Sequence, residues 1–165
     1  MSKQSVFYED RRYFALAAGK YNSLEPQAAM MVVVTGNSAK VAHHDPVFVF
    51  RHDRLVAKYE IVGAGEWQSI PANEAGEARW LVPVLVTKQS SETKALTNPA
   101  SSDDPKTDFL LRHARRQVVD AVVASLTASR KEWDSAGHLI PVKLGDQLLD
   151  AYQLPYTDYH WSDVA

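Results

Sequence analysis

The chain has 165 residues, no cysteine, and 18 Lys and Arg against 20 Asp and Glu, which gives a formal net charge of −2. Disulfides, thiolate metal sites, iron–sulfur clusters and cysteine nucleophiles are therefore excluded. A protein that tracks nucleic acid by electrostatics alone is usually far more basic. The length predicts one domain over residues 1–165, and the apolar content of 45% is ordinary for a globular protein.

No run of 18 consecutive apolar residues occurs in the chain, so the sequence predicts no membrane-spanning helix. The first ten residues lack the apolar core of a signal peptide. We therefore expect a cytoplasmic protein that has no membrane partner.

Strand patterns dominate the first half of the chain. Residues 1–26 are ambiguous, because their apolar positions suit a helix while residues 12–18 also suit a strand. Residues 28–35 predict a buried strand, and residues 46–62 predict a hairpin that turns at residues 52–53.

The two arms of this hairpin differ in their expected environment. Both faces of Val47–Phe50 are apolar, which predicts a sheet that is covered on both sides there. In the second arm Lys58 and Glu60 lie on the face opposite Leu55 and Tyr59, and we expect that face to be wetter.

Two further strands and a long polar stretch follow. Residues 67–70 predict a short strand and residues 78–87 a strong one. Pro83 removes a backbone donor, which favours an edge or a bulged position for the second of these strands. Residues 88–106 are almost wholly polar, so we interpret them as a flexible loop and favour a connector over a loop that orders on binding.

A long amphipathic helix is predicted from about Thr107 to Trp133. Arg112, Arg116 and Arg130 align on its outer side, with Arg115 to one side. The apolar positions recur at helical spacing and are expected to form its buried face: Leu110, Leu111, Ala114, Val118, Ala121, Val122 and Leu126.

The remaining elements are short. Residues 139–142 suggest a strand and residues 144–152 a helix. The fold class that follows is α+β, an antiparallel sheet of four to six strands packed against one long helix in the C-terminal half. A small β-barrel plus a helix is the alternative.

No catalytic or metal motif emerges from the sequence, and no cofactor is predicted. His43, His44 and Asp45 precede one strand, and His52 and Asp53 follow it, so the two groups lie roughly 15–20 Å apart and cannot share one metal. Adjacent residues on an extended chain also point to opposite faces. We interpret both groups as surface turns, with a hydrolase using a His/Asp site as an alternative function.

Charge is segregated in the last third of the chain. Residues 107–133 carry five Lys and Arg against three acids, whereas residues 134–165 carry one Lys against five Asp. The acidic segment either folds back on the helix or leaves it open to a partner. The residues predicted to bind a partner combine the basic stripe with aromatic anchors near the C-terminal end: Arg112, Arg115, Arg116, Arg130, Lys131, Tyr156, Tyr159 and Trp161.

The leading functional hypothesis is a non-enzymatic interaction protein. Its partner would be a protein or nucleoprotein complex, as for an inhibitor or adaptor of nucleic-acid machinery. A single-stranded nucleic-acid-binding protein is the alternative, in which aromatic residues of the sheet stack on bases. The candidate stacking residues are Tyr13, Phe14, Phe48, Phe50, Tyr59, Trp67 and Trp80.

Overall fold

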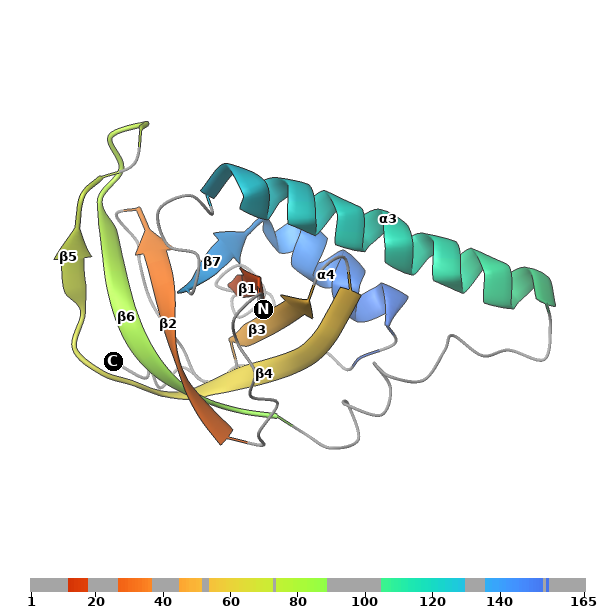
Figure 1. Ribbon diagram of the computed structural model, residues 1–165, viewed down its shortest axis with the longest axis horizontal. Coiled ribbons are helices and arrows are strands. Elements are labelled where there is room, and N and C mark those ends of the chain that lie inside the picture. The colour runs from red at the N-terminus through yellow and green to blue at the C-terminus, as the bar shows by residue number, and fades with distance from the viewer. Residues whose placement is uncertain are drawn as a thin grey trace, which may run out of the picture.

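The computed structural model describes residues 12–17, 27–36, 45–51, 54–72, 74–88, 105–129, 136–152 and 154, and Figure 1 shows their arrangement. Within these ranges no helix is long and apolar enough to cross a membrane. In chain order the elements are β1 (Tyr13–Ala17), β2 (Gln27–Thr35), β3 (Pro46–Arg51), β4 (Arg54–Ala64), β5 (Gln68–Ile70), β6 (Arg79–Thr87), α3 (Pro105–Ser129), β7 (Ala136–Ile140) and α4 (Val142–Ala151).

Six strands close into a barrel. Their order is β2-β7-β1-β3-β4-β6, and β6 pairs back onto β2 along nine residues. The short strand β5 pairs with β6 beside the end of β4. The α+β class is confirmed, and the small barrel plus helix, rather than an open sheet, is the alternative that fits.

The barrel is not purely antiparallel. The strand β1 runs parallel to β3, and β2 runs parallel to β7, while the other pairs are antiparallel. The expectation of an antiparallel sheet is wrong at these two pairs. The β2–β7 pair arises because β7, which follows α3, inserts between β1 and β2, a placement that local periodicity does not encode. The β1–β3 pair is parallel because the chain between these strands passes through β2, two places away in the sheet, so a crossover and not a hairpin joins them.

Most element predictions are confirmed with small shifts in their bounds. The ambiguous N-terminal region contains a strand at Tyr13–Ala17. The long helix begins at Pro105, so residues 105 and 106 belong to it and not to the polar loop predicted at 88–106. Residues 89–104 and the predicted helix end at 130–133 lie outside the described residues.

Pro83 lies in a strand that has partners on both sides, so the edge position predicted for it is wrong, whereas the pairing of this strand with β4 does contain a register shift, between Ile61 and Gly63. Towards β2 it sits opposite Met31. Its carbonyl points the other way and accepts the N–H of Gly65 at 2.8 Å, where β4 has ended and β5 has not begun. The missing N–H of Pro83 thus faces the gap between two partner strands, where a ladder bond is not required.

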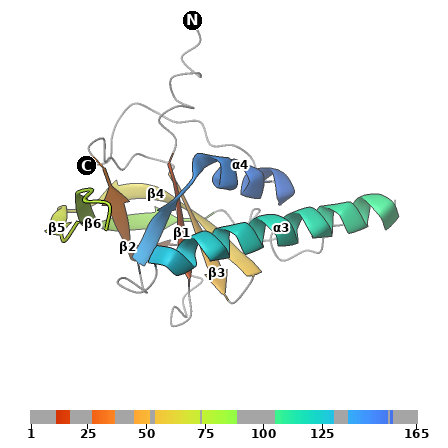
Figure 2. The ribbon, with the colours of Figure 1, turned by 90° about the horizontal axis from the view of Figure 1, so that it is seen from above.

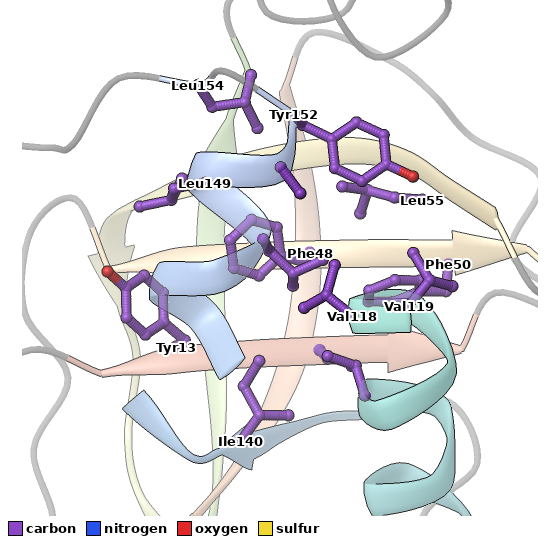
Figure 3. Packing of buried hydrophobic residues seen from close by; sticks show 14 of the residues in the cluster. Tyr13, Phe48, Phe50, Leu55, Val118, Val119, Ile140, Leu149, Tyr152 and Leu154 are labelled. Carbon is purple, nitrogen blue, oxygen red and sulfur yellow. The ribbon is translucent and has the colours of Figure 1, made fainter. Parts of the chain in front are cut away.

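Two apolar layers hold the fold together. Val47 and Val49 point into the barrel, whereas Phe48 and Phe50 point towards α3 and α4 (Figure 3). The prediction that this strand is covered on both sides is confirmed. Lys58, predicted on a wetter face, is only 1% exposed, because it pairs with Phe48 and so shares the face that the helices cover.

The helix α4 lies unusually close to β1. A Cβ atom added to Gly145 would overlap the Tyr13 ring, so only glycine allows this approach. The Tyr13 hydroxyl donates a hydrogen bond to Asp146 Oδ1 at 2.6 Å, and its ring stacks on Phe48 with centroids 5.9 Å apart. One aromatic side chain therefore joins β1, β3 and α4.

Replacing Gly145 with alanine tests this approach. An exposed helical Gly→Ala change usually stabilises a protein by up to about 1 kcal/mol. Here the added methyl group must displace the Tyr13 ring, and we expect a loss of about 1–3 kcal/mol in the free energy of unfolding. Chemical denaturation followed by far-UV circular dichroism measures it. The exposed Gln147→Ala in the same helix is the control, and a Gly145→Ala variant as stable as that control would contradict the packing.

Candidate interaction surface on α3

The buried face of α3 differs from the one predicted. Val118, Val122 and Leu126 are buried as expected, together with Val119, which the prediction omitted. Leu110, Ala114 and Ala121, which were assigned to the buried face, are exposed. The inward stripe is therefore rotated around the helix towards Arg115 and Val119.

Arg115 explains this rotation. Its Nε–H donates to the carbonyl of Ala151 at 3.0 Å, and its guanidinium carbon lies 4.5 Å from the centre of the Tyr152 ring. A helix ends with unsatisfied carbonyls and a partial negative charge, which an arginine side chain complements. Arg115 therefore belongs to the α3–α4 contact, whereas Arg112 and Arg116 are exposed.

The first part of α3 extends beyond the barrel. Two views at right angles show the green end of α3, where the helix begins, projecting past the strands (Figures 1 and 2). Among the α3 residues whose side chains the structure describes, Val118 is the first that is buried. The stretch of ten residues before Arg115 is about 15 Å long at the rise of an α-helix, and it presents side chains on more than one side.

An apolar and cationic surface lies on this projecting part and extends to Arg116. We call it the α3 patch and define it by Phe109, Leu110, Arg112, His113 and Arg116. Four of these residues, at spacings of three, four and seven, share one face. Phe109 and Leu110 are 67% and 62% exposed, the highest values among the large apolar side chains that the structure describes.

Phe109 and His113 form the centre of the α3 patch. Their rings stack with centroids 6.2 Å apart and an interplanar angle of 4°. Sequence reasoning overlooked Phe109 and placed Leu110 in the core. No local signal in the sequence separates Leu110 from the core residues, because it keeps the helical spacing of Val118 and Val122, and only the position of α4 decides where α3 is covered.

Several predicted residues cannot be placed. Arg130, Lys131, Tyr156, Tyr159 and Trp161 lie outside the described residues, as do His43, His44, His52 and Asp53. The structure therefore brings together Arg112 and Arg116, assigns Arg115 to an internal contact, and leaves the rest of the predicted surface as a prediction.

The described residues that were candidates for base stacking or for a His/Asp hydrolase site are mostly buried. Trp67 and Trp80 are half-buried against the barrel interior, with ring centroids 6.1 Å apart, and Asp45 is fully buried. Across the described ranges no group of three or more His, Asp or Glu side chains could hold a metal ion. The remaining candidates for base stacking are at most 1% exposed, which leaves no ring face for a base: Tyr13, Phe14, Phe48, Phe50 and Tyr59.

Burial raises the pKa of Tyr152 above its ordinary value, and the nearby Arg115 and Arg54 oppose part of that shift. Folding therefore favours the neutral phenol of Tyr152 over the phenolate. The Tyr152 ring belongs to the same apolar layer as Leu55 and Leu154 (Figure 3), and the Arg115 guanidinium carbon lies 4.5 Å from its centre.

No protein-family model, no curated protein and no solved structure matches this chain.

Two adjacent arginines test the assignment of Arg115. Arg115→Lys keeps the charge but loses the planar stacking and the Nε donor, so we expect a loss of about 1 kcal/mol in the free energy of unfolding. Arg116→Lys, one residue on and exposed, should change it by less than about 0.5 kcal/mol. If denaturant titrations show that both variants lose the same free energy of unfolding, Arg115 does not contribute to the α3–α4 contact.

The pH dependence of stability tests the environment of Tyr152. Folding raises the pKa of Tyr152. The contribution of this group to the free energy of unfolding is therefore complete below its pKa in the unfolded chain, about 10, and falls as the pH rises further. Tyr152→Phe lacks this group. Urea titrations between pH 8 and pH 11 should show wild type losing more stability than Tyr152→Phe at the alkaline end, and parallel curves would contradict the assignment.

Proposed function

We propose that this chain is a non-enzymatic interaction protein that binds a partner protein, alone or within a nucleoprotein complex, through the α3 patch. The observation that carries the proposal is the exposure of Phe109 and Leu110 beside Arg112 and Arg116 on a helix that leaves the body of the fold.

The position of these side chains supports a binding role over a merely solvated surface. Scattered exposed apolar residues are normal, but Phe109 and Leu110 are adjacent and lie on a projecting helix. Aromatic and arginine side chains are enriched where proteins bind one another, and a few such anchors supply most of the binding energy. A helix that presents them can enter a groove on a partner.

The same side chains favour a protein surface over bare nucleic acid. Phosphate contacts use cationic and polar groups and gain nothing from an exposed leucine. The α3 patch instead alternates apolar and cationic side chains, which fits an apolar groove with an acidic rim. A narrower form of this proposal is that the chain inhibits nucleic-acid machinery or serves as an adaptor for it.

Combined substitution of the α3 patch tests the function. Phe109→Ser with Arg116→Glu removes one apolar anchor and reverses one charge at exposed positions, so the free energy of unfolding should stay within about 1 kcal/mol of wild type. Loss of one anchor and one charge should weaken partner capture at least about tenfold. The measurement is a quantitative affinity capture from native-host extract by tagged full-length protein.

Lys143→Glu is the matched control, because Lys143 is also an exposed helical cation, on α4. It should retain the same captured partner at wild-type level. If the double variant and Lys143→Glu capture that partner equally, the α3 patch is not the binding surface.

A further inference from the structure

The strand β4 loses its partner on one side before it ends. Its contact with β3 finishes where the N–H of Ile61 donates to the carbonyl of Asp45 at 3.0 Å. Beyond that point the chain stays beside β6 on the other side, through Gly63 and Ala64 in β4 and then through β5. We call residues 62–70 the β4–β5 edge. Among the described residues, no backbone group pairs with this edge on the side away from β6.

The backbone of the β4–β5 edge can pair with a further strand. In an extended antiparallel chain alternate residues direct both their N–H and their C=O to the same side, so about four residues of this edge present both groups away from β6. The edge is accessible, because Gly65, Gln68 and Ser69 are exposed and the Val62 side chain is 40% exposed. An uncovered edge of this kind is a template for a strand of another chain.

The charges around the β4–β5 edge select its occupant. Between Lys58 and Arg79 the sequence contains four glutamates and neither aspartate, lysine, arginine nor histidine. Glu66 lies on the edge, and Glu74 and Glu77 are exposed in the loop that follows β5. Arg79 donates its Nε–H to a backbone carbonyl of that loop at 2.8 Å. Two copies of so acidic an edge would repel each other, whereas a strand that carries lysine or arginine would be attracted.

We propose that the β4–β5 edge binds an extended, basic segment of another protein, which joins the sheet as a further strand. Backbone hydrogen bonds supply the affinity of such strand addition, and the carboxylates beside the edge supply the preference for cationic side chains. This surface is separate from the α3 patch, since β5 and the start of α3 lie at opposite ends of the molecule (Figures 1 and 2). The inference therefore does not rest on the proposed function.

A synthetic peptide tests the proposal on the full chain. The probe is as long as the β4–β5 edge, has blocked ends, and alternates valine with lysine. Its binding is followed through the backbone amide resonances of isotope-labelled protein. We expect saturable shifts at the amides of residues 62–70 and none at residues 105–117, because the α3 patch is itself cationic.

Two matched comparisons separate backbone pairing from charge. Of two probes that are N-methylated on alternate residues, the one that loses the donors facing the edge should bind at least about tenfold more weakly than the other. Glu66→Lys should weaken binding of the unmodified probe roughly three- to tenfold. Asp120→Lys makes the same change of charge at an exposed position of α3 and should leave binding unchanged.

Three results would overturn the inference: no shift at residues 62–70, equal binding of the two methylated probes, or equal effects of the two charge reversals. Shifts at these amides that depend on protein concentration without any probe would also overturn it, because the edge would then pair with a second copy of the chain. None of these results bears on the α3 patch, so the proposed function is tested separately.

Discussion

The fold depends on how closely α4 approaches the barrel. Gly145 allows the Tyr13 ring to lie directly against the helix backbone, and the same ring stacks on Phe48. A helix seated this deep brings its C-terminal carbonyl at Ala151 to the level where Arg115 of α3 can reach it. The position of α3 therefore depends on the contact between Gly145 of α4 and the Tyr13 ring.

That arrangement anchors only part of α3. Val118, Val119, Val122 and Leu126 pack against α4 and the barrel, whereas Phe109, Leu110 and Ala114, nearer the start of the helix, are exposed. Extending an existing helix adds one hydrogen bond for each residue fixed, so an anchored half can propagate into an exposed one. Leucine, arginine, alanine and glutamine, which are good helix formers, fill most of residues 110–117. The result is a projecting helix that carries exposed apolar side chains without weakening the core.

The local sequence pattern was enough to predict most strands and helices, but it was not enough to predict how the strands pair. Alternation and apolar runs located β2, the β3–β4 hairpin and β6, because a strand buried on both faces leaves a continuous apolar signature. The insertion of β7 between β1 and β2 depends on pairing across more than 100 residues, which periodicity does not record. The same limit applies to the α3 patch. Leu110 has the spacing of a core residue, and only the position of α4 decides that the core ends before it.

The claim that the projecting part of α3 is continuous with the anchored part is tested most directly by a distance across it. Spin labels on cysteines at the exposed positions Lys106 and Ala124 can be measured by double electron–electron resonance in the full chain. An unbroken helix predicts one narrow distribution, with the two Cα atoms about 27 Å apart before the label linkers are added. A broad distribution centred on shorter distances would show that the helix is broken between Lys106 and Ala124, so that the α3 patch is not continuous with the anchored part, and the proposed binding surface would then not exist as described.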